Sequence, residues 1–284
     1  MTLHAGRSTA LEYYPCRYGA SRVLFRGPRR HLNGDYLAFV GGTETYGRFV
    51  EDPFPALLEK RLAKACVNLG AVNAGVDLYL NEPSILDLAS EANVKVLQIM
   101  GAHTMSNRYY QVHPRRNDRF LRASDPMQAL YPEVDFTEFH FVRHMLNTLQ
   151  EVSAERFSEV VRELRMAWTA RMKSMLSVLK GDVILLWFDR HDIPSAANGV
   201  SPNEPPFITR DMVDGLKPRV AGLVEVTASQ AALQAGTKGM IYNEFESSAA
   251  AEVLGPIAHE EVTEALEPVT SAILQAQWKK GGAD

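Results

Sequence analysis

The chain has 284 residues, a formal net charge of -4, 46% hydrophobic residues and 23% charged residues. This composition is typical of a globular protein with a large core and excludes a mainly disordered chain. The acidic balance provides no overall basic face for nucleic acid. Residues 1–7 do not start an apolar leader, and no stretch approaches the roughly 20 apolar residues of a membrane span. We therefore expect a cytoplasmic protein that binds neither nucleic acid nor a membrane.

Strand and helix patterns alternate along most of the chain. Residues 1–34 contain turn formers that interrupt any helical period, and we expect an irregular arm packed on the domain. The pattern predicts strands at 36–41, 66–70, 94–100, 183–188 and 222–227 and helices at 55–63, 83–92, 154–179, 229–235 and 256–275. This order indicates one α/β domain over residues 35–277, with an Arg-rich insertion at about 106–150.

Repeated strand-turn-helix units predict a mainly parallel sheet with helices on both faces, which is a three-layer sandwich. In such sheets, ligands bind outside the carboxyl ends of the strands, at the point where the strand order reverses. The turns at 41–47, 70–77, 101–107 and 189–192 each follow a predicted strand directly. These turns are therefore the candidate positions for a functional site.

The first of these turns is rich in glycine and hydroxyl groups. Gly41 and Gly42 allow backbone N–H groups to face a ligand, and Thr43 follows them. A tight turn with a purely structural role is the alternative. The turn lacks the Gly-Lys-Ser/Thr of a phosphate-binding loop and the third glycine of the dinucleotide fingerprint, so we expect no nucleotide cofactor. No element carries His, Asp and Glu at metal-ligand spacing, and we expect no metal.

Four short motifs resemble those of the SGNH, or GDSL, hydrolases. The first is residues 39–47, where the family has a strand that ends in Gly-Asp-Ser and a glycine shortly after it. The others are residues 68–75, residues 94–103 and residues 259–266. The resemblance implies a flavodoxin-like sheet and Thr43 as the nucleophile. It also implies oxyanion stabilisation by Gly75 N–H and His103, with Asn107 nearby. Residues 14–19 and 25–30 also resemble a family of uncharacterised alphaproteobacterial proteins.

The sequence departs from the hydrolase pattern at its catalytic positions. Thr43 stands in place of the nucleophilic Ser, and Gly42 in place of the Asp. A threonine hydroxyl needs a base to accept its proton, but alignment on His259 places no histidine in the family's base position. Two histidines remain as candidate bases: His259 itself, or His191, which has carboxylates beside it. A surface or capping role is the alternative for both.

Arginines cluster in the insertion. Arg115, Arg116 and Arg119 follow the third predicted strand in a chain that is acidic overall. Such a cluster favours a local site for carboxylate, sulfate or phosphate groups. The alternative is that these arginines pair with the chain's own acidic residues.

Three functions fit these patterns. The first is an acyl-ester hydrolase or acyltransferase acting on a carbohydrate or another anionic substrate. The second is a catalytically degenerate protein of the same fold that recognises an anionic surface glycan or a partner protein. The third is a transferase that holds a phosphorylated or sulfated donor at the glycine turn.

Overall fold

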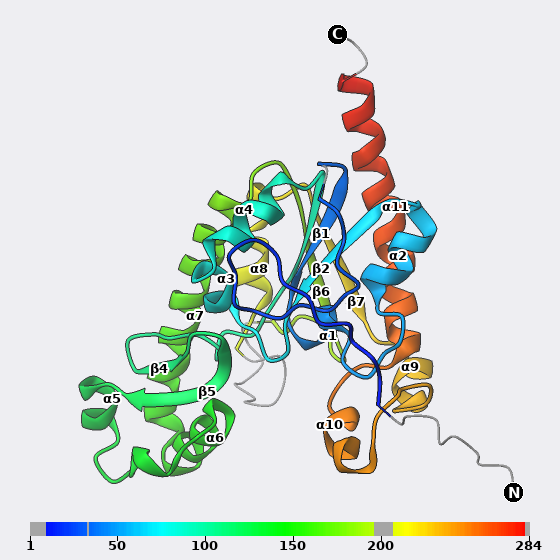
Figure 1. Ribbon diagram of the computed structural model, residues 1–284. Helices are drawn as coiled ribbons and strands as arrows, with labels where there is room; N and C mark the ends of the chain where they lie inside the picture. The colour runs from blue at the N-terminus through cyan, green and yellow to red at the C-terminus, as the bar shows by residue number, and fades with distance from the viewer. Residues whose placement is uncertain (1–9, 33, 196–206, 282–284) are drawn as a thin grey trace, which may run out of the picture.

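The protein is built on a five-stranded parallel sheet with the strand order β2-β1-β3-β6-β7 (Figure 1). The computed structural model describes residues 10–32, 34–195 and 207–281. The strands are β1 (Tyr36–Gly41), β2 (Ala65–Gly70), β3 (Val94–Gln98), β6 (Asp182–Asp189) and β7 (Gly222–Thr227). The predicted parallel sheet is confirmed. The order reverses between β1 and β3, because the chain leaves β1 for β2 and returns on the other side.

Helices cover both faces of the sheet, so the predicted α/β sandwich is also confirmed (Figure 1). One face is covered by α3 (Val76–Leu80), α4 (Pro83–Glu91), α7 (Ala154–Val178) and α8 (Arg210–Asp214). The other is covered by α2 (Phe54–Leu62), α9 (Gln230–Ala235) and α11 (Pro256–Gly281). Among the helices of these described segments, none combines the length and apolarity that a bilayer crossing requires.

Strand β1 shows why the sequence forms this architecture. All six of its residues are buried, as expected for a parallel strand with helices on both faces. Side chains alternate between the faces of a strand. Leu37 and Phe39 accordingly enter the core beneath α2 and α11, whereas Ala38 and Val40 enter the core beneath α4 and α7. Because both faces of β1 pack into a core, the strand requires an unbroken run of apolar residues.

The long helix α7 ties one face to the end of β3. It begins at Ser153, whose hydroxyl accepts a hydrogen bond from Arg156 N–H as an N-cap. Its buried residues recur at helical spacing, from Phe157 to Met175. Among them, Trp168 donates its indole N–H to the Met100 carbonyl at 2.7 Å. This contact fixes the loop that follows β3.

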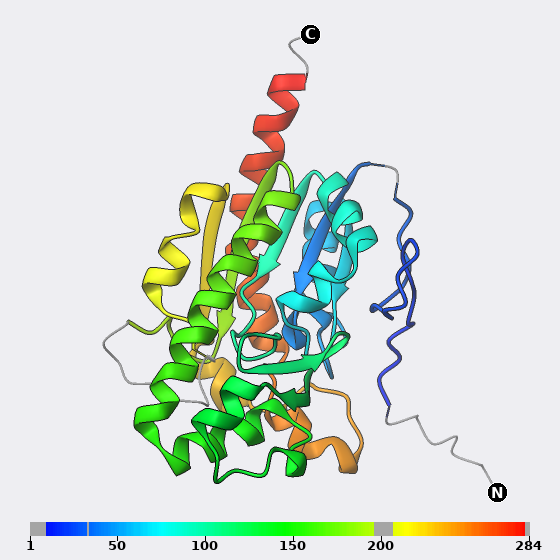
Figure 2. The ribbon, with the colours of Figure 1, turned by 90° about the vertical axis from the view of Figure 1, so that its left-hand side faces the viewer.

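The segment between β3 and α7 forms a small unit beyond the carboxyl ends of the sheet strands (Figures 1 and 2). It contains the antiparallel strands β4 (Tyr110–His113) and β5 (Arg116–Ala123), then α5 (Asp125–Leu130), η1 (Phe136–Glu138) and α6 (Val142–Val152). The sequence pattern predicted no strands in this segment. Register shifts in the β4–β5 pair break the regular alternation of buried and exposed residues by which a strand is recognised.

The N-terminal residues 10–32 run as an irregular arm along one side of the molecule (Figure 2). Cys16 and Phe25 exchange two backbone hydrogen bonds of 2.9 Å. The buried guanidinium of Arg26 donates to the carbonyls of Gly47 and Glu51. The arm is thus attached just behind the glycine turn.

Three short elements complete the described structure. They are η2 (Lys217–Arg219), η3 (Glu244–Glu246) and α10 (Ser247–Ala251), and the last two follow each other after α9.

Candidate functional site

A cavity of about 770 Å³ opens at the carboxyl ends of β1, β3 and β6. It includes the switch point between β1 and β3, where ligands bind in sheets of this type. Its walls come from the turn after β1, residues 73–74, residues 98–104, the start of α6, the end of β6 and residues 249–254. Four residues expected from the sequence line it, namely Gly42, Thr43, His103 and His191.

The glycine turn is shaped by close contact with β3. A Cβ atom on Gly41 would lie 2.5 Å from Gln98 Oε1 and 2.6 Å from Gln98 Cβ, so a side chain has no room there. Gly42 is different, because the atom nearest to its Cβ position, Glu44 Oε2, is 3.6 Å away. Gly41 is therefore required by packing. At Gly42, where the SGNH pattern places an Asp, a Cβ atom would make only ordinary van der Waals contacts.

Gln98 organises the start of helix α1 (Thr43–Tyr46) from the neighbouring strand. Its buried Oε1 accepts hydrogen bonds from the Gly42 N–H at 2.9 Å and the Thr45 hydroxyl at 2.6 Å. Its Nε2 donates to Glu44 Oε2 at 3.1 Å. Because donors converge on the oxygen, the amide can be oriented in only one way. The amide nitrogen is consequently held against the Glu44 carboxyl.

Glu44, in α1, and Asp189, at the end of β6, both line the cavity. Burial raises the pKa of the Glu44 carboxyl above its usual range, and the negative charge of Asp189 raises this pKa further. The hydrogen bonds from Gln98 and from the backbone N–H of Glu44 itself, together with the charge of Arg190, act in the opposite direction. Burial likewise raises the pKa of Asp189, against hydrogen bonds from His191. Neither carboxyl was among the site residues expected from the sequence.

The Thr43 hydroxyl is engaged by a neighbouring loop. Its Oγ1 accepts a hydrogen bond from Asn73 N–H at 3.0 Å and donates to Asn73 Oδ1 at 3.4 Å. Asn73 has a left-handed backbone (φ 57°) and also donates from Nδ2 to Asp118 Oδ2 at 3.2 Å. Within the described residues, both hydrogen bonds of the Thr43 hydroxyl go to Asn73. Of the histidines that the structure describes, none is hydrogen-bonded to it as a base.

His103 and His191 reach the cavity in different states. His103 Nδ1 is buried and has no hydrogen-bond partner within the described residues. Burial lowers the pKa of His103 to about 3, and the charge of Arg143 contributes. This imidazole is therefore neutral at physiological pH. His191 is half-exposed, with its Nδ1 3.5 Å from Asp189 Oδ1.

His259 does not reach the cavity, contrary to the expectation that it could serve as the base. Its side chain is 1% exposed and packs against the rings of Phe54 and Phe188 on the α11 face of the sheet. Its Nδ1 accepts the Phe54 N–H at 3.2 Å. Burial lowers the pKa of His259 to about 3, with a contribution from Arg26. His259 is therefore a core residue that accepts a hydrogen bond from the first N–H group of α2.

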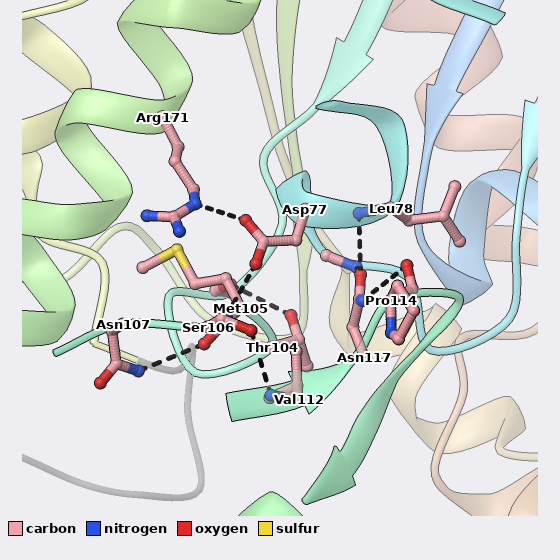
Figure 3. Close-up of polar contacts among 12 residues, drawn as sticks. Asp77, Leu78, Thr104, Met105, Ser106, Asn107, Val112, Pro114, Asn117 and Arg171 are labelled. Atoms are coloured by element: carbon pink, nitrogen blue, oxygen red, sulfur yellow. Dashed lines mark hydrogen bonds and ion pairs between the residues drawn. The ribbon is translucent and has the colours of Figure 1, made fainter. Parts of the chain in front are cut away.

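Gly75 and Asn107 are used by the structure itself. The Gly75 N–H donates to Asn117 Oδ1 at 2.8 Å, so it is not free to stabilise an oxyanion as expected. Figure 3 shows Asn117 reaching from β5 to α3, where its Oδ1 also accepts the Leu78 N–H at 3.1 Å. Asn107 Nδ2 donates to the Met105 carbonyl, and its Oδ1 accepts the Tyr109 N–H at 2.8 Å. The Gly75 N–H thus helps to fix the insertion on α3, whereas Asn107 fixes the turn that leads into β4.

Asp77 provides a second link between α3, the insertion and α7 (Figure 3). Its carboxylate accepts the Ser106 N–H at 2.7 Å and pairs with the Arg171 guanidinium. A buried carboxylate is tolerated when it is paired and hydrogen-bonded in this way. The insertion that forms one wall of the cavity is therefore held by a polar network as well as by apolar packing.

The expected anion site at Arg115, Arg116 and Arg119 does not coincide with the cavity. Arg115 is exposed in the turn between β4 and β5, and Arg116 is exposed at the start of β5. The Arg119 guanidinium lies over the Phe141 ring, 4.1 Å from its centroid. The arginines that line the cavity are Arg48, Arg143 and Arg190. Short sequence clusters could not reveal these three, because they come from separate elements.

The three cavity arginines contact the segment from η3 to residue 254. Arg190 donates to the Ala251 carbonyl at 2.8 Å. Arg143 lies 3.7 Å from Glu252, and Arg48 lies 3.6 Å from Glu246. Within the described ranges, no group of three or more His, Cys, Asp or Glu side chains is arranged to hold a metal ion.

Comparison with curated proteins gave no match to the chain. Comparison with protein-family models gave a match that covers residues 1–274 and therefore includes the arm, the sheet, the insertion and most of α11. The chain belongs to the family described as "Domain of unknown function (DUF6473)".

Proposed function

We propose that the protein binds a small anionic carbohydrate in the cavity at the carboxyl edge of its sheet, without using Thr43 as an activated nucleophile. The observation that carries this proposal is the pairing of the Thr43 hydroxyl with Asn73 in a cavity bordered by three arginines. A hydroxyl becomes a good nucleophile when a base accepts its proton. Asn73 cannot accept a proton in this way.

The size and position of the cavity support a small-molecule site. Its volume of about 770 Å³ lies within the range of roughly 300–1,000 Å³ that is usual for small-molecule pockets. It opens at the strand-order reversal, where backbone and side-chain groups from several loops converge. A ligand of one or two sugar rings fits such a site.

The charges on the walls favour an anionic ligand. Arg143 and Arg48 are 3.7 Å and 3.6 Å from their carboxylate partners, which is longer than a charge-assisted hydrogen bond. Exposed ion pairs of this kind contribute little stability. A ligand carboxylate or phosphate can therefore displace Glu252 or Glu246 and form shorter contacts with the same guanidinium groups.

Phe141 offers an apolar surface beside these charges. Its side chain lines the cavity and is 43% exposed, although it is a large aromatic residue. The Arg119 guanidinium covers part of the ring and holds it in place. Aromatic rings present a rigid apolar surface, on which the C–H face of a sugar can pack. Arg143 follows two residues later at the start of α6 and is positioned for an acidic substituent on the same sugar.

The second candidate is acyl transfer, as the resemblance to the SGNH hydrolases implies. It is favoured by the position of Thr43 at the end of β1, in the same cavity as His103 and His191. Activity on p-nitrophenyl acetate separates the two proposals. We expect the slow background hydrolysis to be equal in the wild type and in Thr43→Ala. Turnover that disappears in Thr43→Ala would establish the second candidate and reject the first.

Calorimetric titration tests the binding proposal directly. We expect D-glucuronate or D-galacturonate to bind and D-glucose to bind at least tenfold more weakly, with affinity for the acids falling as salt increases. Arg143→Gln should lose at least tenfold in affinity, since a hydrogen bond to a charged group contributes about 1.5–3 kcal/mol. Arg162→Gln, on the exposed side of α7, is the matched control. Equal binding of acids and glucose would contradict the proposal.

A further inference from the structure

Residues 237–253, which we call the strap, leave the domain after α9 and return to it before α11. The two ends meet, because a Cβ atom on Gly255 would lie only 2.9 Å from the Gly236 carbonyl oxygen. Figures 1 and 2 show α10, in orange, beyond the carboxyl ends of the sheet strands, where the insertion also lies. Within residues 237–253, all of which the structure describes, only Ala250 is buried. A segment with so few buried side chains opens locally at low cost in free energy.

The two halves of the strap are attached to the domain in different ways. In the first half, the Ile241 N–H donates to the Phe49 carbonyl at 2.9 Å. The second half supplies part of the cavity wall, at residues 249 and 251–253. From residue 243 onward, the hydrogen bonds and ion pairs between the strap and the other described parts of the domain come from arginines that line the cavity, namely Arg48, Arg143 and Arg190. The arginines that favour a ligand anion therefore also hold the strap.

Two of these contacts are ion pairs of the kind that a ligand anion can replace. Arg143 lies 3.7 Å from Glu252, and Arg48 lies 3.6 Å from Glu246. The Glu252 side chain is 73% exposed, so it can turn into solvent without crossing the core. A ligand anion that forms a charge-assisted hydrogen bond with either guanidinium is the stronger partner. The ligand and the strap therefore compete for the same two cations.

Arg190 contacts the backbone of the strap instead of a carboxylate. It donates to the Ala251 carbonyl at 2.8 Å and to the Val253 carbonyl at 3.1 Å. Both hydrogen bonds come from Nη2, which leaves the other guanidinium donors for a ligand. The end of the strap next to α11 therefore stays attached when the strap carboxylates are released.

We propose that the strap competes with the ligand for the cavity arginines, so that binding of the anion releases Glu252 and Glu246 and loosens the strap. This inference rests on the proposed function and describes how the same site is regulated. By linkage, the factor by which the ligand loosens the strap equals the factor by which loosening of the strap raises the affinity for the ligand. The energies of exposed ion pairs correspond to a factor of up to about five for each pair.

Calorimetric titration with D-glucuronate tests the competition at Arg143. Glu252→Gln keeps the shape of the side chain and removes its charge, and we expect it to bind glucuronate about two- to fivefold more tightly than the wild type. Glu244→Gln is the matched control, because Glu244 is exposed on the same strap and makes no ion pair within the described residues. We expect this control to change the affinity by less than about 1.5-fold, since salt screens a charge that has no partner in contact.

A double variant separates competition for Arg143 from simple repulsion between Glu252 and the ligand. If Glu252 acts by occupying Arg143, its removal gives no gain once the guanidinium is absent. The combination of Arg143→Gln with Glu252→Gln should therefore bind glucuronate no more tightly than Arg143→Gln alone. A gain that persists in the double variant would show repulsion and not competition.

Hydrogen exchange measures the strap itself. We expect the amides of η3 and α10 to exchange at least about twofold faster with saturating glucuronate, because the ion pairs that hold them are lost. The amides of β1 should exchange no faster, since the ligand stabilises the native domain as a whole. Without ligand, Glu252→Gln should already show faster exchange of η3 and α10, and Glu244→Gln should not.

Three results would overturn this inference and leave the binding function intact. They are a gain in affinity that is no larger for Glu252→Gln than for Glu244→Gln, a gain that persists in the double variant, and slower exchange of the strap when glucuronate binds. Circular dichroism checks the fold of each variant. Absence of any glucuronate binding by the wild type would overturn both the inference and the proposed function.

Discussion

Gln98 donates a hydrogen bond of 3.1 Å from its side-chain amide to Glu44. Its amide oxygen accepts hydrogen bonds from the Gly42 N–H and the Thr45 hydroxyl. Replacing Gln98 by Met keeps the approximate volume and removes the acceptor. The Gly42 N–H and the Thr45 hydroxyl are then buried without a partner, at a cost of about 1–3 kcal/mol each. We expect Gln98→Met to lower the free energy of unfolding by about 2 kcal/mol or more, as measured by urea denaturation.

The control for this prediction is Gln128→Met, because Gln128 is exposed on α5. Surface substitutions of this kind usually change stability by less than about 0.5 kcal/mol. If Gln98→Met were no more destabilising than Gln128→Met, the convergence of donors on the Gln98 oxygen would have no energetic importance.

The two glycines of the turn should respond differently to the same substitution. A methyl group on Gly41 would overlap the buried Gln98 side chain, whereas a methyl group on Gly42 meets only ordinary contacts. Overpacking in a rigid core costs about 1–3 kcal/mol. We expect thermal unfolding at clearly lower temperature for Gly41→Ala and near-wild-type behaviour for Gly42→Ala. Equal effects of the two substitutions would contradict the tighter packing at Gly41.

His259 should make the protein sensitive to acid. Its pKa is about 3 in the folded state, far below the ordinary value of 6.5. Between these values the unfolded chain binds a proton that the folded chain does not, so the stabilisation present above about pH 6.5 is lost as the pH falls. For one such group, the free energy of unfolding drops by at most about 1.4 kcal/mol per pH unit.

Urea denaturation at several pH values between 4 and 7 measures this slope. We expect His259→Asn to be less stable at neutral pH, because it leaves space beside Phe54 and Phe188, yet to show a shallower loss of stability with acid. His140→Asn, at an exposed position, controls for the loss of an imidazole. An unaltered slope in His259→Asn would mean that another group dominates the acid response.

Asn117 should be essential for the attachment of the insertion. It is fully buried, and its Oδ1 accepts the N–H groups of Gly75 and Leu78. In Asn117→Leu both N–H groups lose their acceptor, and we expect a loss of about 2–4 kcal/mol in unfolding free energy. Hydrogen exchange should show reduced protection of these two amides specifically. Asn81→Leu, at an exposed position, is the control, and retained protection in Asn117→Leu would argue against this role.

The sheet could be predicted closely from the sequence because its signal is local. Strand β1 was expected at 36–41 and is observed at Tyr36–Gly41, since an unbroken apolar run before two glycines is specific for a buried parallel strand. The hairpin of the insertion gave no such signal. Strand β5 carries several charged residues and buries only Asn117, Phe120 and Ala123. Its position depends on contacts with distant elements, which no local pattern encodes.

The site could be predicted only in part, because many of its contacts join residues that lie far apart in the sequence. Thr43 and His103 were placed at one cavity because the ends of parallel strands share an edge. Gln98 had a usable signal, as a polar residue that directly follows the apolar pair Val96 and Leu97 at the end of its strand. The uses of Gly75 N–H and His259 could not be foreseen. Each depends on a single hydrogen bond, to Asn117 and from Phe54, across at least 42 residues of sequence.

The walls of the cavity come from segments that lie far apart in the chain, from the turn after β1 to residues 249–254. Such a cavity exists only when the sheet, the insertion and the segment before α11 are all in place. A ligand held there binds the native state and not the unfolded chain. It therefore stabilises the entire domain by mass action, by about 2.7 kcal/mol when its concentration is 100 times its Kd. The occupancy of the cavity and the fraction of protein that is folded at equilibrium are thereby linked.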